Sequence, residues 1–177
     1  YMASEFARRI GVKEEEAFLV GGGTGKPTGI FQTVTEGATS SGASITFDDV
    51  MDLYHSLKSP YRKNAVWILN DATVKALRKL KDNNGNYIWQ PSVQAGVPDM
   101  ILNRPYFTSS FVPTIETGKK VLAFGDFSYY WIADRQGRSF KRLNELYAES
   151  GQVGFLASQR VDGKLILNEA VKVLTMK

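Results

Sequence analysis

The sequence predicts an α+β fold, because helical and strand patterns occupy different parts of the chain. Apolar residues recur at helical spacing in several segments before residue 81, whereas most of residues 119–177 alternates or runs apolar as strands do. The chain has 177 residues and no cysteine, and it shows no internal repeat. It is long enough for one large domain or two small ones, whose stability must come from packing or from assembly.

The N-terminal segment predicts a helix that one glycine interrupts. Met2, Phe6 and Ile10 fall four residues apart and share one helical face. Gly11 then breaks this pattern, since glycine weakens a helix interior. Gly21 marks the expected end of the helical region.

A polar stretch at residues 33–46, rich in Gly, Ser and Thr, predicts a loop or a boundary. Thr46 and Asp49 follow it with the spacing of a capping box, which predicts a helix start. Apolar residues at helical spacing continue this helix to Leu57, and Pro60 is expected to close the segment.

The middle of the chain predicts a strand followed by a second helix. Residues 65–69 (AVWIL) form a short apolar run typical of a strand that is buried on both faces. Asn70 and the residues after it predict a capped helix with Val74 and Leu77 turned inward. Residues 82–87 (DNNGNY) predict a turn.

The C-terminal third predicts several short strands. Residues 119–127 and 128–137 read as strands with a turn at Asp134 to Gly137, and residues 138–143 read as a further short strand. Two strand-like runs then flank Asp162-Gly163, the residue pair that favours a two-residue hairpin.

The stretch GGGTGKPTG, Gly21 to Gly29, resembles a phosphate-binding loop but lacks its required residues. A Walker loop ending in Gly25-Lys26 needs glycine at position 20, where the chain has Val20. It also needs a hydroxyl residue after the lysine, and Pro27 supplies neither that group nor an amide N–H. The stretch follows a predicted helix rather than a strand. It is therefore interpreted as a reversal of the chain.

The ionisable residues predict no catalytic, cofactor-binding or metal site. His55 is the single histidine, and with no cysteine it cannot build a His-based zinc site. A structural or exposed role is expected for it. Asp48, Asp49 and Asp52 form the densest carboxylate group, which acids at a helix start explain without function.

Three consecutive aromatic residues, Tyr129, Tyr130 and Trp131, place large rings on both faces of one predicted strand. The interpretation favoured here is core packing on one face and a protein–protein surface on the other. The alternative is a stacking platform for single-stranded nucleic acid, but no basic stripe interleaves these rings.

The sequence pattern also resembles a known family, the major capsid proteins of tailed bacteriophages of the Hong Kong 97 type. Five segments carry the resemblance in order along nearly the whole chain. They are EEEAFLVGGGTGKPTGIF (14–31), AVWILNDATVKALRKLKDNNGNYIWQP (65–91), GVPDMILNRPYFTSSFVP (96–113), VLAFGDFSYYWIADRQG (121–137) and FLASQRVDGKLILNEAVKVL (155–174).

The resemblance implies a two-part subunit. A peripheral domain would comprise residues 1–42 and about 134–165, with the remnant of a spine helix and long strands. An axial domain would comprise residues of about 43–133 and 166–177, with helices on a central sheet. Copies would form pentamers and hexamers that close into an icosahedral shell around a double-stranded DNA genome. Many modest heterologous contacts can sum to such a shell without covalent help.

The family pattern also includes an N-terminal arm, an extended loop and most of the spine helix, all of which would lie before Tyr1. The chain begins with Tyr1 rather than methionine, so it is expected to be the C-terminal core of a longer protein. Some family members crosslink a lysine of that loop to an asparagine of the peripheral domain. No asparagine of this chain, Asn168 included, is assigned to that role.

The resemblance further implies a virion protein made in the bacterial host cytoplasm, with no enzymatic activity and no cofactor. Scaffolding and portal proteins are implied as partners, and non-specific DNA contact is consistent with the net charge of +4. No apolar run is long enough for a membrane helix, and no membrane partner is expected. Two alternatives remain open: a nucleotide-binding enzyme using residues 21–29, and a non-catalytic α+β binding module.

Overall fold

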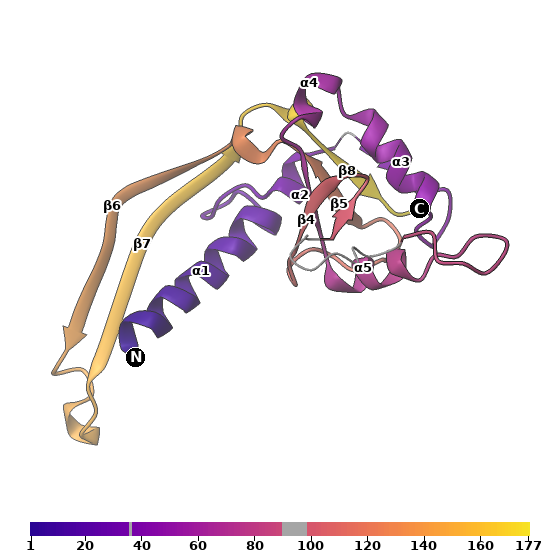
Figure 1. The fold of residues 1–177 in the computed structure, drawn as a ribbon. Coiled ribbons are helices and arrows are strands. Elements are labelled where there is room, and N and C mark those ends of the chain that lie inside the picture. The colour runs from indigo at the N-terminus through magenta and orange to yellow at the C-terminus, as the bar shows by residue number, and fades with distance from the viewer. Residues whose placement is uncertain (36, 90–98) are drawn as a thin grey trace.

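The computed structural model describes residues 1–35, 37–89 and 99–177 (Figure 1). Two of the segments quoted above extend into residues 90–98, which lie outside the described residues. The helices are α1 (Met2–Val20), α2 (Ile30–Thr33), α3 (Phe47–Ser56), α4 (Ser59–Arg62) and α5 (Asp71–Arg78), with 3-10 turns η1 (Phe127–Tyr129), η2 (Ala148–Ser150) and η3 (Asn168–Ala170). The strands are β1 (Gly37–Thr39), β2 (Val66–Leu69), β3 (Met100–Ile101), β4 (Arg104–Thr108), β5 (Lys120–Gly125), β6 (Tyr130–Leu143), β7 (Gly154–Leu165) and β8 (Val171–Thr175).

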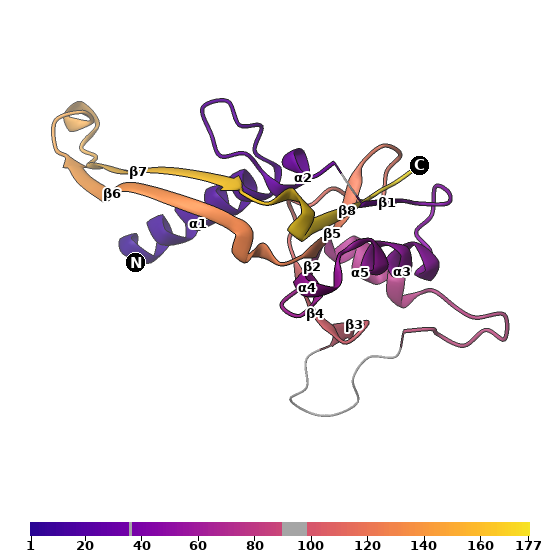
Figure 2. The same cartoon turned by 90° about the horizontal axis from the view of Figure 1, so that it is seen from above.

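Six strands form a mixed sheet in the order β1-β8-β5-β2-β4-β3. The central strand β5 pairs antiparallel with both β2 and β8, whereas β1–β8 and β2–β4 are parallel pairs. Helices α3 and α5 lie on one face of this sheet and α2 lies on the other (Figure 2). We call the six-stranded sheet with α2–α5 the body.

The body has an apolar cluster on each face of its sheet. On the α3 and α5 side, Trp67 is fully buried and stacks on Phe124 with ring centroids 4.0 Å apart. On the other side, Leu19 from the end of α1 packs with Phe31 of α2 and Val173 of β8. Because both faces are covered, β5 is buried along most of its length, as its apolar sequence requires.

The two predicted helix caps are present in the body. The Thr46 hydroxyl accepts a hydrogen bond from the Asp49 N–H at 3.2 Å, and the Asp49 carboxylate accepts from the Thr46 N–H at 2.8 Å. The Asn70 side chain likewise accepts from the Ala72 N–H at the start of α5. The expected strand at residues 65–69 is confirmed as β2, with Leu69 fully buried.

Strands β6 and β7 form a separate two-stranded sheet that projects from the body, with α1 lying alongside it (Figures 1 and 2). We call β6, β7 and their connecting loop the hairpin, and the hairpin together with α1 the extension. The N-terminus lies toward the far end of the extension, and the C-terminus lies in the body.

Two turns predicted in the hairpin are wrong. Asp134 to Gly137 is no turn but an irregularity inside β6, where Gln136 and Gly137 both have φ of 65° and the register with β7 shifts. Asp162-Gly163 lies inside β7, paired with Ala133 and Ile132. The chain instead reverses at residues 144–153. Long-range pairing of two continuous strands has overridden the local turn chemistry.

Two helix boundaries also differ from the prediction. Gly11 does not interrupt α1, which continues through it to Val20. A single interior glycine costs only about 1 kcal/mol, and the rest of the helix compensates for it. Pro60 does not close the preceding segment, because α3 ends at Ser56 and Pro60 lies in the first turn of α4. Proline is well tolerated there, since its missing N–H would have no helical partner.

Candidate functional site

The Gly-rich stretch forms the expected chain reversal at the end of α1. Gly22 and Thr28 form an antiparallel bridge, and the Gly29 N–H donates to the Gly21 carbonyl at 2.8 Å. A Cβ built on Gly21 would lie 2.3 Å from the carbonyl oxygens of Ala17 and Pro27. Glycine is thus required by close backbone approach at this crossing.

The surroundings of this reversal disfavour a phosphate group. The reversal follows the C-terminal end of α1, where the helix dipole places partial negative charge. A hollow of about 290 Å³ beside Lys26 is also lined by Lys13 and Glu16, and these two side chains pair with each other at 2.8 Å. The geometry therefore agrees with a structural reversal of the chain.

The other ionisable candidates are His55 and the three aspartates Asp48, Asp49 and Asp52, and they differ in burial. His55 is exposed, and its ring contacts the neighbouring Tyr54 with centroids 5.2 Å apart. Asp48 and Asp52 are exposed, whereas Asp49 is buried. Burial alone would raise the pKa of Asp49, but hydrogen bonds from Thr46 and Ser41 outweigh it and lower the pKa. Asp49 is accounted for by its capping role.

Metal and membrane features are absent from the described part of the chain. Residues 1–35, 37–89 and 99–177 hold no cluster of three or more His, Asp or Glu side chains arranged to bind a metal ion. None of their helices has both the length and the apolar character of a membrane span.

Of the three consecutive aromatic residues, Tyr129 and Tyr130 pack against other rings and Trp131 is exposed. The Tyr129 ring meets the Tyr61 ring edge-on at 5.7 Å, and the Tyr130 ring meets Phe18 of α1 at 5.8 Å. Burial raises the pKa of Tyr130 to about 12, and its hydroxyl donates to the Thr28 carbonyl at 3.0 Å. Trp131 points to solvent with 65% of its surface exposed.

A polar cluster joins the body to both strands of the hairpin. Glu169, between β7 and β8, accepts hydrogen bonds of 2.5 Å from Lys58 and from the Tyr61 hydroxyl. Tyr61 also contacts Tyr129, which lies between β5 and β6. Hydrogen bonding to Glu169 raises the pKa of Tyr61 to about 12, and the bonds from Lys58 and Tyr61 lower the pKa of Glu169. The short helix α4 and its N-cap Lys58 thereby contact both chain connections between the body and the hairpin.

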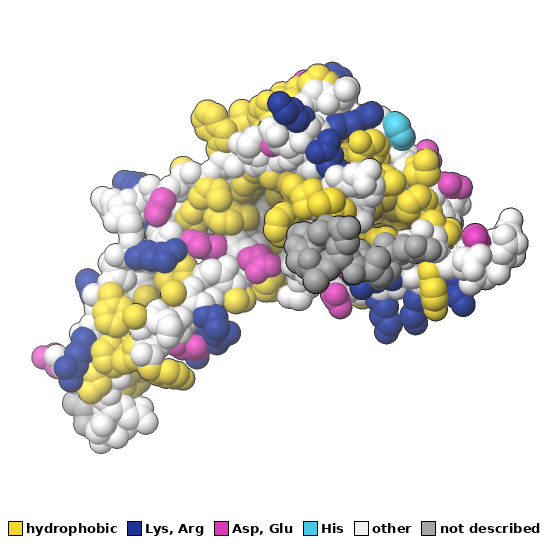
Figure 3. All heavy atoms as spheres, viewed as in Figure 1, with side chains coloured by type: hydrophobic (Ala, Val, Ile, Leu, Met, Phe, Trp, Pro, Cys, Tyr) yellow, Lys and Arg dark blue, Asp and Glu magenta, His cyan; other side chains and the backbone are white. Residues whose placement is uncertain are grey.

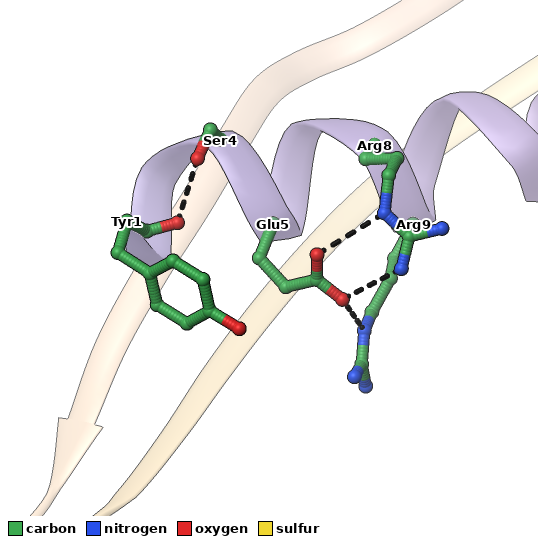
Figure 4. A network of polar contacts seen from close by, with 5 residues as sticks. All are labelled: Tyr1, Ser4, Glu5, Arg8 and Arg9. Carbon is green, nitrogen blue, oxygen red and sulfur yellow. Dashed lines mark hydrogen bonds and ion pairs between the residues drawn. The ribbon is translucent and has the colours of Figure 1, made fainter.

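The outer turns of α1 carry an ion-pair cluster on their solvent side (Figure 4). Glu5 accepts hydrogen bonds from Arg8 and from Arg9, with closest distances of 2.7 Å to each guanidinium. These bonds lower the pKa of Glu5 to about 2, and the bond from Arg8 has the largest effect. The cluster keeps two positive charges beside one negative charge on this helix.

The other side of α1 packs on the hairpin through aromatic rings. Phe6 meets Phe140 of β6 edge-on at 5.3 Å, and Phe140 stacks on Phe155 of β7 at 5.8 Å. These contacts leave a groove of about 480 Å³ that is lined mainly by apolar side chains. Its lining residues are Met2, Ala3, Phe6, Ala7, Ile10, Arg138, Ser139, Phe140, Phe155 and Ala157.

The extension exposes many large apolar side chains. Side chains along it are visible as apolar patches between charged residues in Figure 3. Its exposed large apolar residues are Met2, Val12, Trp131, Ile132, Phe140, Leu146, Tyr147, Val153 and Leu156. Apolar patches on a protein surface mark interaction sites more often than chemistry. The arrangement can bind other macromolecules over a long surface.

The opposite face of the hairpin is basic. Alternation along the strands turns Ala157, Gln159 and Val161 toward α1, so their neighbours face away from it. Arg135 and Arg160 lie directly opposite each other on this outer face. Like charges in that position are unfavourable unless a counter-charge approaches. The outer face carries Trp131, Arg135, Lys141, Leu156, Arg160, Asp162 and Lys164.

The comparisons identify the family. The sequence matches the phage capsid family over residues 1–176, and the chain belongs to that family. Two solved structures, described as the capsid of an empty and of a native GTA particle, match with TM-scores of 0.87 and 0.86. Their sequences are 30% and 32% identical to this one, and 99% of this chain is covered in each comparison. No curated protein matches the sequence.

A more distant match supports the fold alone. The SrpI encapsulin complex from Synechococcus elongatus PCC 7942 matches with a TM-score of 0.70 at 14% identity, over 98% of this chain and 63% of that chain. Together with the GTA capsids it confirms the predicted α+β fold of the Hong Kong 97 type. The chain spans 65% and 64% of the two GTA capsid chains, so it corresponds to about two thirds of their length.

Sequence reasoning missed several residues that build this surface. Phe140 and Phe155 were not singled out, and neither were Tyr61 and Glu169. The period-two pattern in residues 155–161 was a usable signal, because it predicts one strand with an apolar inner face. The Tyr61–Glu169 contact spans 108 positions and had no local signal.

Proposed function

We propose that this chain is the core of a structural subunit of an icosahedral bacteriophage head. Copies assemble into pentamers and hexamers that enclose a double-stranded DNA genome, and the chain has no enzymatic role. The observation that carries this proposal is the apolar extension, which projects from the body as a long surface suited to contacts between copies. Membership of the phage capsid family supports it.

The proposal divides the subunit as the sequence suggested. The peripheral domain comprises residues 1–42 and about 134–165, and the axial domain comprises about 43–133 and 166–177. In this division the peripheral domain supplies contacts around the edges of each ring, and the axial domain supplies contacts around its centre. The separate β6–β7 sheet supports it, because most of residues 134–165 pair with each other and not with the six-stranded sheet.

Further partners belong to the same proposal. The protein is made in the host cytoplasm and ends in the virion, with scaffolding and portal proteins as assembly partners. DNA contact is non-specific and electrostatic. The basic outer face of the hairpin supports this part, because its arginine and lysine side chains suit phosphate groups.

Assembly is the property to test. The natural protein that contains this chain is expressed in bacteria, purified, and examined by negative-stain electron microscopy and sedimentation velocity. Rings, sheets or closed shells are expected. A uniform monomer across a range of salt, pH and protein concentration would refute the proposed function.

A matched variant locates the assembly surface. The exposed Trp131 is replaced by Glu, and the exposed Phe107 of the body serves as a control position with Phe107→Glu. Both variants should fold, since neither side chain is buried. Trp131→Glu is expected to weaken assembly more strongly than Phe107→Glu, because it places a charge on the extension.

A further inference from the structure

The loop at the tip of the hairpin is compact and exposes three large apolar side chains, Leu146, Tyr147 and Val153. The Tyr147 carbonyl accepts hydrogen bonds from the N–H groups of Ser150 and Gln152 at 3.2 and 3.1 Å, which close the loop on itself. Gly151 permits the reversal with φ of 66°. Leu146 nevertheless remains 64% exposed at the end of the molecule. A closed loop that presents apolar side chains to solvent is suited to docking.

The tip is acidic, and the region around the groove is basic. Residues 144–153 contain Glu145 and Glu149 and no lysine or arginine. Arg138 lines the groove, and Arg8, Arg9 and Lys13 lie nearby on α1. The carboxylates on this part of α1 are Glu5, which pairs with Arg8 and Arg9, and Glu14, which lies 3.8 Å from Arg138, so the cations there outnumber the carboxylates. The tip and the groove are therefore complementary in charge as well as apolar character.

The tip cannot fill the groove of its own molecule. Phe140 and Phe155 form one wall of the groove and lie within a few residues of the tip on the same two strands. Folding the tip back would break the ladder up to the final pair, Leu143 and Gly154. A tip that reaches this groove must therefore come from another copy.

We propose that the hairpin tip of one subunit docks in the α1–hairpin groove of a neighbouring copy. Leu146 enters the apolar groove, and Glu145 and Glu149 face the basic residues Arg9 and Arg138 at its edge. This contact rests on the proposed assembly function and names the two surfaces that it joins. It is heterologous, because the tip and the groove are different surfaces, and a heterologous contact repeated around an axis closes a ring when its rotation divides a full turn.

Disulfide trapping tests the contact directly, because the natural sequence described here contains no cysteine. The natural protein is made in two differently tagged forms, one with Leu146→Cys and one with Ala7→Cys, which are mixed during assembly and then oxidised. A covalent heterodimer is expected in assembled particles, because docking brings the two Cα atoms within bridging distance. Val12→Cys on the same helix is the matched control, since Val12 does not line the groove.

The outcomes separate this proposal from the proposed function. Particles that contain no disulfide between positions 146 and 7, or that link position 146 to itself, contradict the docking and leave the shell function standing. Linkage of position 146 to Val12→Cys at an equal level also contradicts it. Absence of particles from the parent protein without the introduced cysteines removes the proposed function and the docking together.

Charge reversal gives a second, independent readout. Replacing Glu145 and Glu149 by Lys is expected to raise the protein concentration needed for assembly roughly tenfold at low salt. The added reversals Arg9→Glu and Arg138→Glu should restore most of the loss, because they recreate opposite charges across the contact. An unchanged assembly concentration in the Glu145→Lys, Glu149→Lys protein would overturn the electrostatic part of the proposal.

Discussion

Replacing Gly163 by Ala tests the architecture of the extension at its most crowded point. A Cβ at this position would lie 2.6 Å from the Tyr130 hydroxyl oxygen and 2.9 Å from Cε1 of the same ring. Overpacking of this kind costs about 1–3 kcal/mol. Restricting the unfolded chain returns about 0.4–1 kcal/mol. The expected net loss of unfolding free energy is therefore about 1–2 kcal/mol.

The assay is urea unfolding followed by circular dichroism, in a double-mutant cycle with Tyr130→Leu. Leucine removes the two closest of the three atoms that the new methyl group would meet and leaves Phe18 Cδ1 at 3.0 Å, so most of the overpacking should be relieved in that background. The double variant is expected to be about 1 kcal/mol more stable than the sum of the single effects predicts. Gly163→Ala combined with Phe107→Leu in the body is the control, and additivity is expected there.

The cycle distinguishes the observed strand from the hairpin turn that the sequence suggested. In a turn, Gly163 would need positive φ, and Ala would be destabilising whatever side chain occupied position 130. Strict additivity between Gly163→Ala and Tyr130→Leu would therefore refute the pairing of Gly163 inside β7.

Three further predictions concern the core, the Gly-rich stretch and α1. Trp67→Phe keeps the ring stack but removes the indole N–H that donates to the Ile101 carbonyl. Chemical unfolding should show that the free energy of unfolding falls by about 1–3 kcal/mol. An unchanged free energy of unfolding would contradict the buried hydrogen bond. Titration calorimetry of the natural protein with Mg-ATP should show no binding, and micromolar binding that disappears in Lys26→Ala would reverse the interpretation of that stretch. The pKa of Glu5 is lowered from 4.5 to about 2, so its stabilising effect on α1 is present above pH 4.5 and lost as the pH falls toward 2. Glu5→Gln should flatten the acid limb of a circular-dichroism pH titration, and an acid limb identical to that of the parent would contradict this assignment.

Local chemistry explains what could be predicted from the sequence. Thr46 with Asp49, and Asn70, satisfy backbone N–H groups within three residues, so their helix starts are visible in the sequence alone. The apolar run at residues 65–69 is short enough to indicate a strand whatever surrounds it. The reversal at Gly21 was predicted from glycine and proline, and close backbone approach now explains it.

Non-local packing explains what could not be predicted. Asp162-Gly163 has the composition of a turn, yet it lies inside β7. The missing side chain of Gly163 leaves room for the Tyr130 ring of the partner strand. Gly137 likewise permits a positive φ inside β6 rather than a reversal of the chain. The groove was also invisible, since it is formed by α1 and by strands more than 120 residues further along the chain.

The family resemblance was the most informative prediction about function, and the match over residues 1–176 confirms it at the level of family. The expected lack of catalytic activity and of ligand binding stays a prediction. The calorimetry with Mg-ATP tests the part of it that concerns nucleotides. The geometry adds what the resemblance did not supply, namely a charge-complementary tip and groove at the end of the extension.

The central claim is that this chain assembles with copies of itself through the extension. Cryo-electron microscopy of particles formed by the natural protein tests it most directly, because the subunit contacts can be read from the density. The account predicts closed shells or rings in which the hairpin and α1 of each copy contact neighbouring copies. Shells in which the extension contacts no other subunit, or a protein that stays monomeric under all conditions, would contradict it.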